Sequence, residues 1–353
     1  MVDISIVIPA YNAQSTLKEC LEALQVQLNP PSNQTVEIIV VDNGSTDQTA
    51  EIAAEYGAKL IHEPNKGASN ARNAGIKAAE GEIVCFTDAD CAPLPDWIVT
   101  LTRPLLEKPE LIGGKGIYLT QQKSLTARFV QLEYEDKYDL LRDQTYIDFI
   151  DTYSAVYRRD ALLKFGGFDP EMTYLEDQEL SFRLNQHGCK MVFIPEAIVH
   201  HYHSDTVRKY FQKKRIIGFW KAQVVRKFPR HRIKDSHTPQ VMKVQMGLVM
   251  LSIASLFAAP FLIGLGRFGV SIPSLLLQAA WMLPAGLLAL FAATTLPFIR
   301  KGLPKDQTVA RLSPAFLFVR ALALSVGYVW GTLRPVKFEN SPAELFPQQT
   351  QTG

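Results

Sequence analysis

The C-terminal third of this 353-residue chain is dominated by apolar segments. Residues 244–266 carry no charged side chain, and neither do residues 270–299. A helix of about 20 apolar residues is long enough to cross a bilayer, so both segments are predicted to be membrane spans. A third apolar segment, residues 314–333, is interrupted by Arg320 and could span, lie in the membrane interface or pack on the other two. Its sequence Gly327-x-x-x-Gly331 would permit close contact between helices.

Basic residues cluster on one side of these segments. Residues 208–243, before the first apolar segment, are rich in Lys and Arg, and four more basic residues lie within residues 300–311, after the second. Arg267 is the only basic residue between the two segments. Because cytoplasmic loops carry an excess of Lys and Arg, the N-terminal part and the 300–311 loop are predicted to be cytoplasmic. We therefore expect a multi-pass protein of the cell inner (plasma) membrane.

The first part of the chain alternates between apolar runs and amphipathic stretches. We expect strands at residues 4–9, 37–42, 58–62 and 83–87, and helices at residues 15–27, 46–56 and 68–79. The apolar runs are continuous, which is typical of strands covered on both faces. This β-α-β order predicts an α/β fold with a doubly wound, mainly parallel sheet. Further along, we expect strands near residues 112–119 and 151–157 and helices near residues 124–142 and 175–187.

Length, charge and cysteine content constrain the domain organisation of the chain and the functions that it can have. The formal net charge is +2, so no overall field favours nucleic acid as a partner. The four cysteines are scattered without a C-x-x-C pair, and we expect reduced thiols. We divide the chain into a domain at residues 1–235, a transmembrane helical region at residues 236–334 with two or three spans, and a polar tail at residues 335–353.

Two carboxylates follow the predicted strand at residues 83–87. Asp88 and Asp90 are separated by one residue, so in an extended segment they point to the same side. The carboxyl ends of strands are where open α/β sheets bind ligands. Two oxygen ligands on one side suit Mg²⁺ or Mn²⁺, and such an ion suits a diphosphate. Alone, the pair would be typical of solvated loop acids, but five other segments fit the same chemistry.

Three of these segments suit a nucleotide. The first strand ends in Pro9-Ala10-Tyr11-Asn12, where an exposed tyrosine can line a base. At the end of the next strand, Asp42 can accept a hydrogen bond from a base or ribose, and Asn43 begins a turn. Arg72, near a helix start, can reach phosphate or base. The sequence contains neither G-x-G-x-x-G after the first strand nor a P-loop, so such a site must rely on carboxylates, a metal and basic side chains.

The last two segments offer acid–base and metal chemistry. Glu176 and Asp177 lie at the start of a predicted helix, where acids often only complement the helix dipole. The alternative is a general base that deprotonates an acceptor hydroxyl beside a sugar donor. Three histidines lie within residues 200–203. If this segment is extended, His201 and His203 share a face, and one of them could add a nitrogen ligand to a metal bound by the nearby carboxylates.

The order of these motifs is similar to that of family 2 glycosyltransferases with the GT-A fold. The motifs are IPAYN, VVDNGSTD, NKGASNARNAG, FTDAD, and GGFDP followed by EDQELSFRL, and they cover about residues 3–220. The resemblance implies a GT-A-like domain, a nucleotide-sugar donor, commonly a UDP-sugar, and a Mn²⁺ or Mg²⁺ cofactor. It also implies inverting transfer of the sugar to an acceptor hydroxyl.

The resemblance assigns roles to individual residues. The residues implied to hold the nucleoside are Pro9, Ala10, Tyr11, Asp42 and Arg72. Asp88 and Asp90 would be the sugar and metal carboxylates, with Asp90 as the closest metal ligand. His201 would complete the metal shell, with His203 in reserve, and Asp177 would be the general base.

Two departures from the family pattern bear on function. Many members have two acids where this chain has Asp42 and Asn43, and this difference affects how the second position would recognise the nucleotide base. Processive synthases carry Q-x-x-R-W, whereas this chain has Gln212-Lys213-Lys214-Arg215-Ile216, and the missing Trp favours addition of one sugar. Because the predicted spans hold the domain at the bilayer, we expect a lipid-linked or cell-envelope glycan acceptor, with residues 125–148 on the acceptor side. The alternatives are a polyprenyl-phosphate glycosyltransferase and a catalytically inactive, sugar-nucleotide-binding membrane scaffold.

Overall fold

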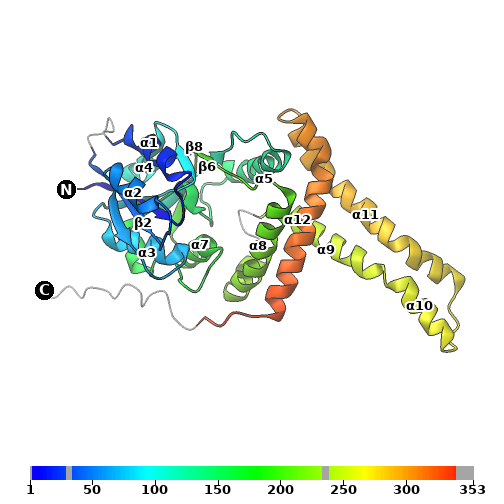
Figure 1. Cartoon of the computed structure of the whole chain (residues 1–353). Helices are drawn as coiled ribbons and strands as arrows, with labels where there is room; N and C mark the ends of the chain where they lie inside the picture. The colour runs from blue at the N-terminus through cyan, green and yellow to red at the C-terminus, as the bar shows by residue number, and fades with distance from the viewer. Residues whose placement is uncertain (1, 29–33, 233–237, 339–353) are drawn as a thin grey trace.

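The structure is a computed structural model of the chain and describes residues 2–28, 34–232 and 238–338 (Figure 1). Its N-terminal part is built on one eight-stranded sheet. In spatial order the strands are β3 (Lys59–His62), β2 (Val36–Asp42), β1 (Ile4–Ala10), β4 (Ile83–Phe86), β7 (Ala155–Arg158), β6 (Leu111–Leu119), β8 (Lys190–His201) and β5 (Cys91–Pro93). The strands from β3 to β4 run parallel, as do β6 and β8, whereas β7 and β5 run antiparallel to their neighbours. The predicted α/β fold is confirmed, and the sheet is mixed.

Helices cover both faces of this sheet. One face carries α1 (Leu17–Gln25), α2 (Thr49–Glu55) and α4 (Trp97–Glu107), and the other carries α3 (Ala68–Ala78), α6 (Arg159–Lys164) and α7 (Glu176–Gln186). In β1, Ile6 and Ile8 enter the first core and Val7 enters the second, as the unbroken apolar run predicts. A Cβ at Gly75 would overlap the Val7 side chain, so this glycine lets α3 lie directly on β1.

The elements expected within residues 4–87 are all present, with ends that differ by a few residues. The sequence did not predict α4, β5 or the long helix α8 (Val207–Lys227). β5 has only three residues, too few to show a period. α8 carries many Lys and Arg residues, so its sequence reads as a basic cluster, although one of its faces is buried. The extended conformation considered for the histidine segment is confirmed up to the end of β8.

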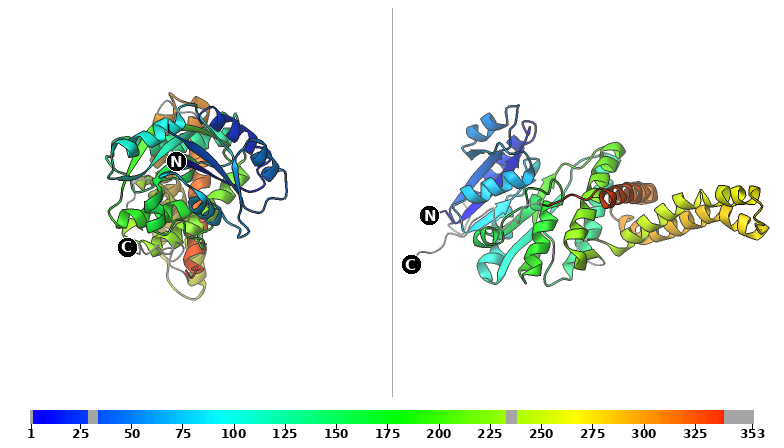
Figure 2. Two further views of the ribbon diagram at one scale, coloured as in Figure 1. Left: turned by 90° about the vertical axis from the view of Figure 1, so that its left-hand side faces the viewer. Right: turned by 90° about the horizontal axis from the view of Figure 1, so that it is seen from below.

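Beyond α8 the chain forms a helical region that extends away from the sheet (Figure 2). α9 (Gln240–Ser255) and α10 (Ala258–Arg267) run outward and α11 (Ser274–Gly302) returns, while α12 (Gln307–Leu333) lies alongside α8. Within the described residues, three helical segments are long and apolar enough to cross a membrane, judged by length and composition: Gln240–Arg267, Ser274–Gly302 and Gln307–Leu333.

Glycines bring α12 into close contact with α8. A Cβ at Gly327 would overlap the carbonyl of Arg215, and one at Gly331 would overlap the carbonyl of Phe219. On α8, a Cβ at Gly218 would in turn overlap the backbone of α12. The Gly-x-x-x-Gly sequence therefore permits close helix contact, as predicted, and its partner is the basic helix α8.

A buried ionic cluster joins the sheet domain to the helical region. Glu133 of α5 (Leu125–Arg142) accepts hydrogen bonds from the Tyr210 hydroxyl at 2.8 Å and from Nη1 of Arg320 at 3.1 Å. The Nζ atom of Lys214 lies 3.2 Å from the same carboxylate. Arg320 also donates to the side-chain oxygen of Gln245, in α9, at 2.7 Å. The arginine that interrupts the third apolar segment is therefore buried against protein.

Ion pairs hold the end of α11 and the loop after it against α5. Lys301 lies 2.8 Å from Asp136, and Lys305 lies 2.5 Å from Glu135. These pairs place the start of the 300–311 loop beside the sheet domain. On which side of a membrane the domain and this segment lie stays a prediction.

The limits predicted for the domains fall partly outside the described residues. The boundary after residue 235 lies within residues 233–237, and most of the predicted tail lies within residues 339–353. The division of the chain at residues 235 and 334 stays a prediction. Because α8 precedes the first boundary and packs on α12, which follows it, the two parts share a buried interface.

Candidate active site

Arg72 of α3 holds two of the predicted acids together. Its Nη2 atom donates to Asp88 at 2.9 Å, and its Nη1 atom donates to Glu176 at 2.6 Å. Asp88 follows β4 and Glu176 begins α7, so three elements meet at this guanidinium. Arg72 is buried, and charge-assisted hydrogen bonds in such surroundings fix geometry strongly. The fold thus joins residues that the sequence presents in three separate motifs.

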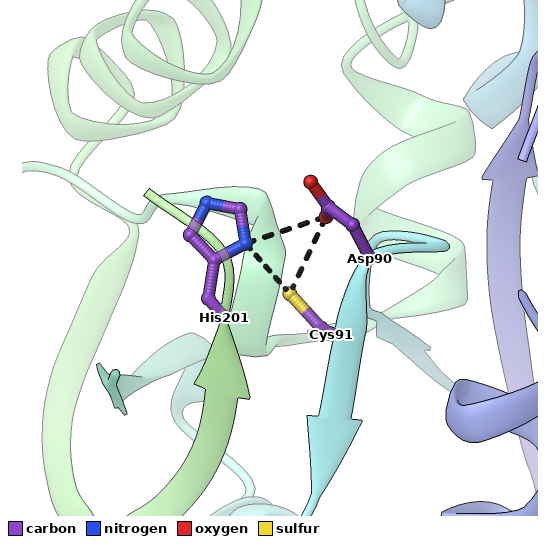
Figure 3. A group of neighbouring side chains, drawn as sticks. All are labelled: Asp90, Cys91 and His201. Carbon is purple, nitrogen blue, oxygen red and sulfur yellow. Dashed lines mark hydrogen bonds and ion pairs between the residues drawn. The ribbon is translucent and has the colours of Figure 1, made fainter. Parts of the chain in front are cut away.

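Asp90, Cys91 and His201 form a second compact group (Figure 3). β5 and β8 pair antiparallel with Cys91 directly opposite His201. The Nδ1 atom of His201 lies 3.3 Å from Oδ1 of Asp90 and 3.6 Å from Sγ of Cys91. Burial opposes the charge of Asp90, but the hydrogen bond and charge of His201 more than offset it, so the pKa of Asp90 is lowered. A carboxylate oxygen and an imidazole nitrogen at this spacing suit a divalent ion such as Mn²⁺.

His203 lies outside this group, beyond the end of β8. Its Nε2 atom lies 3.4 Å from the side-chain oxygen of Gln131, and its ring lies parallel to that of Tyr134 with centroids 6.1 Å apart. Burial lowers the pKa of His203 to about 3, so the ring is neutral at physiological pH. Of the two predicted histidines, only His201 has a nitrogen beside Asp90, which favours it, and the ligand role itself stays a prediction.

A cavity of about 740 Å³ opens at the carboxyl ends of β1, β2 and β4. The predicted site residues on its wall are Pro9, Ala10, Tyr11, Asn12, Asn43, Arg72, Asp88, Asp90 and His201. Tyr11 is 53% exposed, and the Nζ atom of Lys66 lies 5.3 Å from its ring centroid. An exposed aromatic ring can stack on a base, and a lysine beside it suits a phosphate.

Two predicted nucleotide-binding residues are already bonded within the protein. Asp42 is not among the residues that line this cavity, and its carboxylate accepts the backbone N–H of Ser45 at 3.0 Å. The Asn43 amide donates to two carbonyls of the loop after β3 and accepts the N–H of Gly67 at 2.7 Å. Asn43 therefore fixes the loop that carries Lys66. For both Asp42 and Asn43, direct contact with a base stays a prediction.

A second cavity, of about 520 Å³, adjoins the first. The two cavities share Arg72, Asp88, His201 and Lys213. Glu176 and Asp177 line the second cavity, and Asp177 accepts the backbone N–H of Gln178 at 2.7 Å. Burial, together with the charges of Glu176 and Asp151, raises the pKa of Asp177 well above its ordinary value. A carboxylate with a raised pKa is typical of groups that exchange protons during catalysis.

The sequence did not identify Cys91 or Lys213 as site residues. No local pattern marks Cys91, because strand pairing alone brings it to His201. Lys213 lies in the basic run of α8, where the sequence does not show which side chain faces the site. In the structure Lys213 lines both cavities, whereas Arg215 lies over the ring of Trp330, 5.3 Å from its centroid.

The mixed sheet, the carboxylates after β4 and the two adjoining cavities define an α/β domain of the GT-A type. The sequence model of glycosyl transferase family 2 matches residues 5–166. The chain carries a glycosyl transferase family 2 domain.

Relatives extend the match beyond this domain. Pre-mycofactocin glycosyltransferase of Mycobacterium tuberculosis is 25% identical over 276 residues, which are 75% of this chain and 54% of the relative. Probable glycosyltransferase YdaM of Bacillus subtilis is 29% identical over 240 residues, which are 64% of this chain and 56% of the relative. This chain thus spans about half the length of these curated relatives.

A solved structure resembles nearly the whole chain. Mannosyltransferase PcManGT from Pyrobaculum calidifontis, in complex with GDP-Man and Mn²⁺, aligns with a TM-score of 0.58 and 20% identity. The alignment covers 93% of this chain and 87% of that chain. This likeness confirms the GT-A-like fold followed by C-terminal helices.

Proposed function

We propose that this protein is an inverting, non-processive glycosyltransferase. It would transfer one sugar from a nucleotide-sugar, in the first instance a UDP-sugar, to an acceptor hydroxyl of a lipid-linked or cell-envelope glycan. The observation that carries the proposal is the pair of adjoining cavities that share Arg72, Asp88, His201 and Lys213. The donor would occupy the cavity at the strand ends, and the acceptor would occupy the cavity that Asp177 lines.

Asp90 and His201 would hold the Mn²⁺ or Mg²⁺ ion on the wall of the donor cavity. Their oxygen and nitrogen atoms lie 3.3 Å apart, a donor set that fits such an ion. Mn²⁺ and GDP-Man in the PcManGT complex support this assignment. When bound, the ion would neutralise charge on the departing diphosphate. Asp88, fixed by Arg72 at 2.9 Å, would orient the hydroxyls of the donor sugar.

Asp177 would take the proton of the attacking hydroxyl. Its raised pKa makes it a stronger base than an ordinary carboxylate. Arg72 lies between Asp88 and Glu176, and its charge would limit the repulsion among the acids when a donor diphosphate is bound. The acceptor hydroxyl beside Asp177 would then attack the anomeric carbon from the side opposite the departing diphosphate, as inversion by direct displacement requires.

We place the protein in the inner (plasma) membrane with the sheet domain on the cytoplasmic side. The pairs formed by Lys301 and Lys305 hold the end of α11 and the loop after it beside α5, and these basic residues fit the charge rule for cytoplasmic loops. The second cavity is also lined by Met246 of α9 and Leu324 of α12. An acceptor in that cavity would therefore contact helices that cross the membrane.

The proposal is tested by the melting temperature of the detergent-purified full chain with a panel of nucleotide sugars. At least one should stabilise the protein in the presence of Mn²⁺ and not in the presence of EDTA, and should be turned over with release of its nucleotide. Asp90→Asn should remove this stabilisation without changing the melting temperature of the free protein. Asp96→Asn, an exposed acid just before α4, is the matched control. If no donor is turned over, the scaffold alternative replaces the enzyme.

A further inference from the structure

The second cavity extends from the reacting groups to the membrane helices. Its lining includes Asp88 and Asp177 as well as Ile217 of α8, Met246 of α9 and Leu324 of α12. α9 and α12 belong to segments long and apolar enough to cross a membrane. A ligand that fills this cavity can therefore contact the proposed general base and the membrane helices at the same time.

Lysines from three helices line the same cavity. They are Lys137 of α5, Lys213, Lys214 and Lys221 of α8, and Lys243 of α9. Four acids also line it: Asp88 and Glu176 are bound to Arg72, Asp151 is bound by Lys115, and Asp177 is the proposed base. Five lysines and Arg72 thus line a cavity with four acids, and the balance is basic.

The lysines stand close enough together to affect one another. Burial, followed by the charge of Lys214, lowers the pKa of Lys137 to about 7. Lys214 itself is 8% exposed and lies against Glu133. An anion among these ammonium groups would relieve their repulsion, whereas a neutral sugar would not.

We infer that the acceptor is an amphiphile with a phosphate group, which these lysines bind, and an apolar chain that leaves the cavity along α9 and α12. This inference rests on the proposed function and names the chemical class of its acceptor. Phosphate oxygens accept several charge-assisted hydrogen bonds at once, which suits ammonium groups that converge from three helices. A volume of about 520 Å³ holds a ligand of moderate size, so a long chain would continue into the bilayer.

Two acceptors share this chemistry. In a lipid phosphate, a phosphate oxygen attacks the anomeric carbon; the new C–O bond forms as the bond to the diphosphate oxygen breaks, and the nucleoside diphosphate leaves. In a lipid-linked glycan, the phosphate only anchors the molecule, and a sugar hydroxyl attacks by the same exchange of bonds while its proton passes to Asp177. The variant Asp177→Asn separates them: turnover is retained with the first acceptor and lost with the second.

The inference is tested by equilibrium binding to the detergent-purified full chain. The probes are a long-chain polyisoprenyl phosphate, the matching polyisoprenol and inorganic phosphate. We expect the lipid phosphate to bind at least about tenfold more tightly than either of the others, because it alone meets both the lysines and the apolar wall. Equally tight binding of the alcohol, or no saturable binding of the lipid phosphate, would overturn the inference.

Lysine variants locate the binding to this cavity. Lys221→Met and Lys243→Met should each weaken binding of the lipid phosphate several-fold. The matched control is Lys209→Met, because Lys209 is exposed on α8 and pairs with Asp205 at 2.9 Å. Donor binding is measured on the same wild-type sample with Mn²⁺. If the donor does not bind, the proposed function fails; if the donor binds but the lysine variants bind the lipid as tightly as the control, only this inference fails.

Discussion

Replacement of Glu133 by glutamine should weaken the attachment of the sheet domain to the helical region. Glutamine has nearly the same shape as glutamate and keeps an oxygen for the hydroxyl of Tyr210. It removes the negative charge that faces Lys214 at 3.2 Å and Arg320 at 3.1 Å. Two cations would then stay buried without their common anion, which is the unfavourable case for a buried ion pair.

Two estimates of the stability lost in Glu133→Gln agree. Burial opposes the charge of Glu133, yet Lys214 and Arg320 lower its pKa to about 2 from an ordinary 4.5. Since one pKa unit corresponds to about 1.4 kcal/mol, linkage gives about 3 kcal/mol of stabilisation at neutral pH. Removal of one partner from a buried ion pair costs about 3–5 kcal/mol. Because the pKa is depressed on folding, this stabilisation is present above pH 4.5 and is lost as the pH falls from 4.5 to about 2.

The assay is thermal unfolding of the detergent-purified protein followed by tryptophan fluorescence. A loss of about 3 kcal/mol should lower Tm by roughly 5 °C, since the shift per kcal/mol shrinks with chain length. The control is Glu135→Gln, two residues away on the same helix, which pairs with Lys305 at a partly exposed position. Such a surface pair is worth at most about 1 kcal/mol. Equal Tm values for the two variants would refute the reasoning.

Three further predictions concern packing, proton transfer and the leaving group. Gly327→Leu should lower Tm and the yield of monodisperse protein in size-exclusion chromatography, because a Cβ at this position would overlap the backbone of α8. The control is Gly247→Leu, because a Cβ at Gly247 meets open space. Equal yields for the two variants would contradict the α8–α12 packing. If the acceptor is a hydroxyl, kcat/KM should fall as the pH drops below the raised pKa of Asp177, since only the deprotonated carboxylate accepts a proton. A kcat/KM that stays constant from pH 5 to 8 would count against Asp177 as the base. Lys213→Met should lower kcat/KM by about tenfold to a hundredfold without lowering Tm, because Lys213 lines both cavities, where its charge can stabilise the leaving diphosphate. Lys209→Met serves as the control. Equal kcat/KM values for the two variants would exclude this role of Lys213.

The residues whose position in the fold the sequence predicted best are those at the ends of strands. In a parallel sheet, strand ends meet at one edge whatever the length of the connections. The motifs at Pro9–Asn12, Asp88 and Asp90 therefore line a common cavity, as their positions after apolar runs predicted. Arg72 could be added because it lies near the start of the helix after a short strand. For such residues, the local sequence pattern nearly determines where the side chain lies in the fold.

Residues brought together by non-local pairing gave no comparable signal. Cys91 meets His201 only because the three-residue strand β5 pairs with the end of β8, and no periodic pattern marks a contact across that distance in the chain. Asn43 shows the opposite case: its position after a strand suggested a ligand contact, yet its amide is occupied by the loop that begins after β3. The sequence shows which side chain lies at a strand end, but it does not show whether another part of the protein already forms hydrogen bonds with that side chain.

The third apolar segment shows why the second cavity was hardest to predict. Arg320 and the glycines at 327 and 331 read as an interruption and a helix-contact motif in a membrane segment, and hydropathy cannot distinguish lipid from protein as the neighbour. In the structure all three face protein: Arg320 reaches Glu133 of α5, and the glycines meet the backbone of α8. These contacts hold α8 where Lys213 and Lys214 reach the second cavity. If the second cavity binds the acceptor, as we propose, acceptor recognition depends on the packing of helices far apart in the chain, whereas the proposed donor site is formed largely by short motifs.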